Sequence, residues 1–271
     1  MKSRMISSTV RRRPPAGSLL LIAMLWAFYW LPVGWWLLRA DSGARAALPT
    51  DTHFLLGVSV QTLWVSVLAA AIAVLGAYPL VVFWWLSGPL GRVVTIWLTV
   101  PPLIMGFLAR NYAWIALLSG DASPPPMTWL SQYLYTRPAV VFVMSCVFVP
   151  TAFFILMQGI RSVTHGQIDT ARTLGTPDWR IVSSVILPQT RRAAVLAFAL
   201  IVAMGVGFFV TPHMIGGGKC DFIANVILQY INLGQFGHAS RVALVFLLVM
   251  AGPVIWITRY AIRRRIFLTG Y

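Results

Sequence analysis

Side chains of the types that carry out catalysis are few in this sequence, and their spacing assembles no reactive centre. No nucleophile stands beside a base in the pattern that covalent catalysis needs. The histidines share no metal-ligand spacing, and a lone histidine is usually a polar loop or interface residue. These histidines are His53, His165, His213 and His238. We therefore predict neither a metal site nor catalytic residues.

A glycine-rich run that ends in lysine, Gly216-Gly217-Gly218-Lys219, is the nearest approach to a phosphate-binding loop. Such a loop needs another glycine five residues before its last glycine and a Ser or Thr after the lysine. His213 and Cys220 occupy those two positions. The chain is therefore expected to bind no cofactor, and ATP hydrolysis would have to come from another polypeptide.

Polar and aromatic residues gather around Arg110, the one strong charge close to a long apolar segment. An arginine at the bilayer centre costs about 2.5 to 3.5 kcal/mol on insertion scales, so Arg110 should face a solute pathway or snorkel to the outer interface. Its aromatic neighbours could contact a solute, although aromatic residues at an outer boundary are more often interfacial anchors. The candidate pathway residues are Arg110, Asn111, Tyr112, Trp114 and Thr211.

Residues 161–192 contain local signals for a helical hairpin. Thr164 and Gln167 have capping-box spacing, which predicts the start of a first short helix. Gly175 can end that helix in the left-handed conformation that glycine adopts at little cost. The sequence therefore predicts a helix, a tight glycine turn and a second short helix.

The second helix of this hairpin has its own start signals. Thr176 is placed as its N-cap, Pro177 suits the first turn, and Asp178 lies near the positive end of the helix dipole. Its predicted apolar stripe consists of Trp179, Val182, Val185 and Ile186. Amphipathicity alone would also suit a hairpin that merely covers the protein's own helix bundle.

Long apolar segments must position these groups. The 271-residue chain is 59% hydrophobic and 10% charged, which leaves too little polar surface to cover a soluble globule. A bilayer core of about 30 Å needs roughly 20 apolar residues. Six segments qualify, at 18–38, 60–86, 93–118, 139–158, 193–214 and 239–262, whereas 222–233 is predicted as a short external or re-entrant helix. We therefore predict an all-α polytopic membrane protein with six transmembrane helices.

The basic residues indicate how these helices are oriented. Of 21 Lys and Arg residues, 15 fall in the termini, beside the turn after residue 86, or in 161–192. Because cytoplasmic loops are enriched in Lys and Arg, both termini and the hairpin are expected to be cytoplasmic. A nucleic-acid binder would carry its net charge of +15 on one soluble face, whereas these charges lie between apolar runs. The expected partner is therefore a lipid bilayer and no nucleic acid.

The hairpin also contains a longer pattern. The run Asp169-Thr170-Ala171-Arg172-Thr173-Leu174-Gly175, then nine residues, then Val185-Ile186-Leu187-Pro188, resembles the EAA loop of ABC importer permeases. That loop reads Glu-Ala-Ala, three residues, Gly, nine residues, Ile, one residue, Leu-Pro. The spacing is matched throughout, with identity at Ala171, Gly175, Leu187 and Pro188. The sequence departs from the pattern at Asp169, Thr170 and Val185.

This resemblance implies the type I importer permease fold, with residues 1–17 as a basic cytoplasmic segment and 18–271 as one transmembrane permease domain in a bacterial inner membrane. In that family the loop is a coupling helix that sits in a cleft of a cytoplasmic ATPase, which uses ATP and Mg. The implied partners are two ATPase copies, a second homologous permease and an extracytoplasmic solute-binding protein. The implied ATPase-coupling residues are Asp169, Thr170, Ala171, Leu174, Gly175, Val185, Leu187 and Pro188.

Two further stretches resemble permeases of the spermidine/putrescine type: Pro101-Pro102 followed by Arg110-Asn111-Tyr112-Ala113-Trp114, and residues 208–217. They imply a polyamine substrate. A polycation should be attracted by carboxylates or aromatic faces, and the predicted spans carry no acid, so an amino-acid-like compound or an organophosphonate is an alternative. An ion-coupled secondary transporter is the alternative from another class, but such proteins usually keep ionisable residues inside the membrane, and all six aspartates lie in loops.

Overall fold

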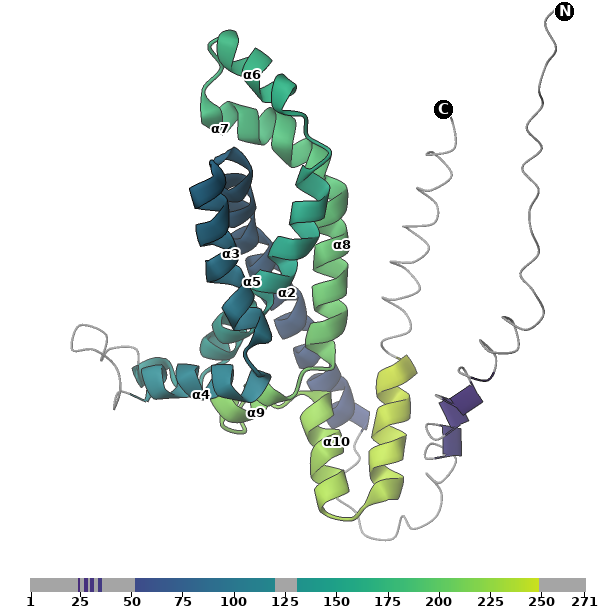
Figure 1. Ribbon diagram of the computed structural model, residues 1–271. Coiled ribbons are helices and arrows are strands. Elements are labelled where there is room, and N and C mark those ends of the chain that lie inside the picture. Colours follow the sequence, from purple (N-terminus) through teal and green to yellow (C-terminus); the bar gives the residue numbers. More distant parts are fainter. Residues whose placement is uncertain are drawn as a thin grey trace, which may run out of the picture.

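Three long helices form the centre of the molecule (Figure 1). The computed structural model describes residues 52–119 and 131–248, together with residues 24, 27–28, 30–31 and 34–35. Helices α2 (Thr52–Leu86), α5 (Arg137–Ile160) and α8 (Leu187–Val206) pack against one another along their lengths. Helix α3 (Pro89–Ile104) lies beside α2 and α5. The described part of the chain contains helices and no strands, as predicted.

Small residues allow the central helices to approach closely. Four alanines on one face of α2 are fully buried, at Ala69, Ala70, Ala73 and Ala77. Apolar lipid tails provide little drive for association between apolar helices, so close backbone packing over small side chains supplies much of the attraction. Phe148 and Phe153 of α5 belong to the same buried core cluster as these alanines. Helix α5 is thus surrounded by protein over much of its surface.

The predicted span 93–118 is wrong as a single helix. The structure divides it into α3 and α4 (Phe107–Leu118), with a bend of 103° between them. Pro101 and Pro102 have no N–H to donate to the preceding turn, and the N–H of Met105 closes the last turn on the carbonyl of Pro101 at 2.9 Å. Helix α4 then crosses the end of the bundle, as Figure 1 shows.

The predicted span 193–214 is displaced at both ends. A continuous helical segment runs from Asp178 to Val206, through α7 (Asp178–Ile181), a π-helical turn (Val182–Ile186) and α8. The second hairpin helix was predicted as a separate short helix, but in the structure it forms the beginning of this span. The segment ends at Gly207, and a short helix α9 (Val210–Gly216) follows with a proline in its first turn.

The remaining elements agree with the predicted ones in part. Helix α10 (Ile223–Asn232) confirms the short helix predicted at 222–233, and the helix Phe236–Leu248 covers the beginning of the last predicted span. By length and composition, three described helices could cross a membrane, or four if α3 and α4 count as one broken span. Residues 1–17, most of the predicted span 18–38 and residues 249–262 lie outside the described residues.

Candidate functional site: a projecting hairpin and an apolar groove

A helical hairpin projects from one end of the bundle, and its base is anchored in the core (Figure 1). Its first helix is α6 (His165–Thr173), and its second is α7 with the π-helical turn. Ile168, Ile181 and Ile186 are buried in the main core cluster. The hairpin is therefore continuous with the packing of α5 and α8, and does not hang from the bundle on flexible linkers.

The predicted capping box at the start of α6 is wrong in its side-chain contacts. Thr164 does occupy the N-cap position, but its side chain makes no capping hydrogen bond. The side chain of Gln167 instead accepts a hydrogen bond from Nε2 of Gln189 at 3.1 Å. Gln189 lies in the first turn of α8, so this bond ties the first hairpin helix to the start of the long helix.

The turn between the two hairpin helices has the predicted left-handed glycine. Gly175 has φ of +75°, and its N–H donates to the carbonyl of Arg172 at 2.9 Å. The N–H of Thr176 donates to the carbonyl of Ala171 at 3.1 Å. This pair of bonds is a Schellman motif, which satisfies the last carbonyls of α6 and fixes the direction of the chain that leaves it.

The start of α7 differs from the prediction by one residue. Pro177 occupies the N-cap position in place of Thr176, so Asp178 is the first helical residue. The carboxylate of Asp178 accepts from Nε of Arg172 at 3.2 Å, across the glycine turn. Both side chains are exposed, so this ion pair adds at most about 1 kcal/mol and mainly favours one orientation of the turn.

Two large apolar side chains, one on either side of the turn, are exposed on the surface. Leu174 is 79% exposed and Trp179 is 67% exposed. The guanidinium of Arg180 lies 5.3 Å from the centre of the Trp179 ring. The predicted apolar stripe is therefore wrong at Trp179, because Ile181 occupies the buried position; Val182 and Val185 are half-buried, and Ile186 is fully buried.

Pro188 accounts for the π-helical turn that joins the hairpin to α8. A proline inside a helix has no N–H for the fourth residue before it, and its ring clashes with that carbonyl. The N–H of Leu187 reaches back five residues to the carbonyl of Val182, which widens the turn. Helical continuity is kept across the proline, so the second hairpin helix and α8 form one continuous segment.

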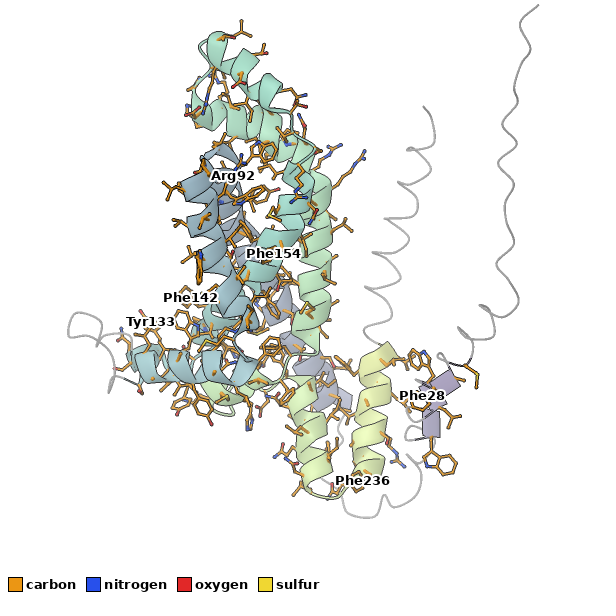
Figure 2. All side chains as sticks on the ribbon, in the orientation of Figure 1. Phe28, Arg92, Tyr133, Phe142, Phe154 and Phe236 are labelled. Atoms are coloured by element: carbon orange, nitrogen blue, oxygen red, sulfur yellow. The ribbon has the colours of Figure 1, made fainter. Side chains whose placement is uncertain are left out.

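The other predicted coupling residues lie on the same projecting unit. Asp169 and Thr170 are exposed on α6, Ala171 is half-buried beside the bundle, and Leu187 and Pro188 are exposed at the start of α8. The structure thus brings all eight onto the hairpin and its junction with α8. Figure 2 shows Arg92, at the start of α3, close to this end of the bundle.

A groove of about 1110 Å³ opens between α3, α4 and α5, around the bend in the broken span. Its walls are almost entirely apolar. The lining residues are Ile96, Trp97, Val100, Pro101, Pro102, Ile104, Met105, Arg110, Ala113, Trp114, Cys146 and Val147. Of the predicted pathway residues, the groove therefore brings Arg110 and Trp114 together. Trp114 also contacts Phe142 edge to face, with ring centres 5.5 Å apart.

Arg110 is buried, with 8% of its surface exposed, and holds the bend together. Its Nη1 donates to the carbonyl of Pro102 at 2.5 Å and to that of Val147 at 3.5 Å. The carbonyl of Pro102 belongs to the last turn of α3, where helix carbonyls have no intrahelical partner. The guanidinium also lies 5.0 Å from the centre of the Phe107 ring. Arg110 therefore connects α3, α4 and α5.

The other three predicted pathway residues do not line this groove. Asn111 is fully buried, and its Nδ2 donates to the carbonyl of Phe107 at 2.7 Å. Tyr112 is exposed on the other side of α4. Thr211 is buried in α9, which packs against α4, and its hydroxyl has no hydrogen-bond partner among the described residues.

Sequence reasoning missed several residues that matter to these two regions. Trp97 and Cys146 line the groove from two helices that are distant in the sequence. The hydroxyls of Tyr78 and Thr190 lie 3.2 Å apart and join α2 to α8 just below the hairpin. Besides Arg110 and Trp114, the sequence signal for the groove was the adjacent prolines at 101 and 102, because they mark the bend around which it forms.

Comparisons with known proteins match most of the chain. The family model for the inner membrane component of binding-protein-dependent transport systems matches residues 63–266. The glucose import system permease protein GlcT of Saccharolobus solfataricus is 20% identical over 70% of this chain and 71% of its own. The permease protein PhnU of Salmonella typhi, assigned to a 2-aminoethylphosphonate transport system, is 22% identical over 86% of both chains.

The fold is also found among solved structures. A chain of a bacterial alginate ABC transporter, solved in complex with its alginate pentasaccharide-bound periplasmic protein, superimposes with a TM-score of 0.66. It is 14% identical and covers 94% of this chain and 96% of its own. The arrangement of helices described above is therefore shared with that transporter chain.

Proposed function

Because this chain belongs to the family of binding-protein-dependent transport system inner membrane components, we propose that it forms the solute pathway of an ATP-driven importer and receives the ATPase on its α6–α7 hairpin. Membership makes it a multi-pass membrane subunit of a transporter, not an enzyme. A partner ATPase supplies hydrolysis, using ATP and Mg, and a second permease and an extracytoplasmic solute-binding protein complete the importer.

The observation that carries this proposal is the pairing of an exposed tip with a buried base in the hairpin. Leu174 and Trp179 offer apolar surface at the tip, where fixed backbone geometry holds them apart. Exposed tryptophan on a rigid support is typical of residues that dominate protein–protein binding. The base continues through the π-helical turn into α8, so force applied at the tip reaches the membrane helices. A hairpin that only covered its own bundle would instead bury these side chains.

The proposal predicts which exposed side chains hold the ATPase. Trp179→Ala should weaken ATPase binding about 30-fold, because a central tryptophan commonly contributes 2 kcal/mol or more at an interface, and Leu174→Ala should weaken it about fivefold. Neither variant should lose thermal stability, since both side chains are exposed. The measurement is titration of the purified complex components by microscale thermophoresis, with thermal unfolding followed in parallel.

A matched control comes from α2, where Trp64 is exposed to a similar extent, at 64%. Trp64→Ala should leave ATPase affinity unchanged. Unaltered affinity in Trp179→Ala and Leu174→Ala would show that the ATPase docks elsewhere.

The proposed orientation places the hairpin in the cytoplasm and the turn after α9 outside. Exposed arginines cluster at the hairpin end, at Arg161, Arg172, Arg180, Arg191 and Arg192, and positive charge is retained on the cytoplasmic side. With both native cysteines replaced by serine, Lys219→Cys should react with a membrane-impermeant maleimide in intact spheroplasts. Ser162→Cys should react only after permeabilisation. The reverse labelling pattern would invert the orientation.

The solute is proposed to be a small organic compound. The relatives named above are assigned to glucose and to 2-aminoethylphosphonate, and neither is named for a polyamine. The organophosphonate alternative from the sequence thus gains a relative with that name, whereas the polyamine expectation gains none. An ion-coupled transporter would leave the projecting hairpin without a partner.

A further inference from the structure

The groove at the broken span carries one fixed positive charge and no negative one. Among the described residues that line it, Arg110 is the single ionisable cation, and none is a carboxylate. The rest of the wall is aliphatic, aromatic or proline. In a poorly hydrated cleft an uncompensated charge acts over a longer range than in water. The positive charge of Arg110 therefore determines whether the groove attracts anionic or cationic solutes.

The hydrogen bonds of Arg110 fix its position but leave donors free. Nη1 is held by the carbonyls of Pro102 and Val147, which are dipoles and do not neutralise the guanidinium. In the described part of the chain, Nε is buried without a partner and Nη2 makes no hydrogen bond. A guanidinium offers five N–H donors in a fixed fork that matches the oxygens of a phosphonate or carboxylate. Arg110 is thus anchored on one side and unsatisfied on the other.

We propose that this groove is a site for a small organic anion, whose phosphonate or carboxylate group pairs with Arg110 while its carbon part packs against Trp97 and Trp114. A polycation would meet the charge of Arg110 in a cleft without a carboxylate to offset the repulsion. The anion is therefore the class of solute that the groove selects. The claim that this anion is the transported solute rests on the importer function proposed above. The claim that the anion binds in the groove is independent of that function.

Cys146 allows the charge preference of the groove to be measured directly. It lines the groove beside Val147, and the chain has only one other cysteine, Cys220, which is fully buried and can be replaced by serine. Thiol reagents of the methanethiosulfonate type come in anionic sulfonatoethyl and cationic trimethylammonioethyl forms. Their rates with Cys146 in the purified full chain, each divided by its rate with free glutathione, give the preference of the groove for one sign.

We expect the normalised rate of the anionic reagent to exceed that of the cationic one on the order of tenfold, because each reagent must approach the fixed charge of Arg110. Arg110→Gln should bring the two rates together, and Arg110→Lys should retain the preference. Equal rates, a faster cationic reagent, or failure of both reagents to reach Cys146 in the otherwise unaltered chain would overturn the proposal.

A second measurement does not depend on a variant that could unfold when Arg110 no longer holds the bend. Phenylphosphonate should slow the reaction of Cys146 with neutral methyl methanethiosulfonate at least threefold, whereas putrescine at the same concentration should not. Protection by putrescine alone, or by neither compound, would overturn the proposal. The cysteine-protection experiment contains no ATPase or binding protein, so a negative result would not contradict the proposed role of the hairpin. Likewise, a negative result in the ATPase-binding experiment would not contradict the proposed anion site.

Discussion

Gly175→Val should abolish stable association with the ATPase while the protein still reaches the membrane in near-normal amount. Gly175 has φ of +75°, where a β-branched residue costs about 1 to 3 kcal/mol. An added Cβ meets no atom within 4 Å, so the effect comes from the backbone alone. Relief of that strain breaks the two hydrogen bonds of the Schellman turn and moves Leu174 relative to Trp179. Co-purification of the ATPase, together with uptake in vesicles, measures the loss.

A matched control lies at the opposite end of the molecule. Gly218 also has a left-handed backbone, with φ of +78°, and an added Cβ there also meets nothing within 4 Å. Gly218→Val should therefore impose a similar strain and leave ATPase association intact. Gly175→Asn should fall between the two results, because asparagine tolerates this conformation better than valine does. Full association and full uptake in Gly175→Val would remove the hairpin from the coupling role.

Features that depend on neighbouring residues in the sequence were predicted more accurately than features that depend on contacts between distant residues. The left-handed conformation of Gly175 was predictable because a helix that must end and turn back within a few residues needs it locally. The capping box failed because the side chain of Gln167 bonds to Gln189, which is 22 residues away in the sequence. Local spacing can place a cap residue, but a tertiary partner can take its side chain.

The same contrast holds for the membrane helices. Apolar length identified the span 139–158 to within two residues at each end, since burial in lipid requires it. It also identified the end of the span 60–86, but α2 begins eight residues earlier, at Thr52. The bend in the span 93–118 was not predictable from length, because Arg110 holds it through contacts to Pro102 and to Val147 on another helix. Equally, the predicted span 193–214 begins too late, because the π-helical turn carries the helix through Pro188 from the hairpin.

Only part of the groove could be predicted. Arg110 and Trp114 were candidates because a charge and aromatic residues beside an apolar segment are unusual in composition. Trp97 and Cys146 carry no such signal, and they reach the groove only because α3 and α5 pack side by side. Tyr112 was predicted as a pathway residue together with Arg110 and Trp114, but it lies on the exposed side of α4. Which face of α4 lines the groove depends on the bend.

Gly159→Val should disrupt the base of the hairpin and lower both the thermal stability and the ATPase association of the protein. A Cβ added at Gly159 in α5 would lie 2.3 Å from the Cβ of Ala193 in α8, a distance that real side chains do not adopt. Neither atom can move without its helix, so α5 and α8 must separate just below the hairpin. Overpacking of this kind costs about 1 to 3 kcal/mol, and more for a β-branched residue. The separation also strains the contact between Tyr78 and Thr190. Thermal unfolding and ATPase co-purification measure the two losses.

Exchanging Gly159 and Ala193 tests whether the effect comes from this clash or from a general intolerance of substitution at Gly159. Gly159→Ala alone should destabilise the protein, but Gly159→Ala combined with Ala193→Gly should recover most of the loss. In the double variant the added Cβ faces the Cα of residue 193 at 3.7 Å, an ordinary contact. Gly57→Ala on α2 is the control, since its Cβ meets nothing within 4 Å and alanine favours the helix by up to about 1 kcal/mol. If the two changes were additive, with no recovery in the double variant, close approach of α5 and α8 would not be what positions the hairpin.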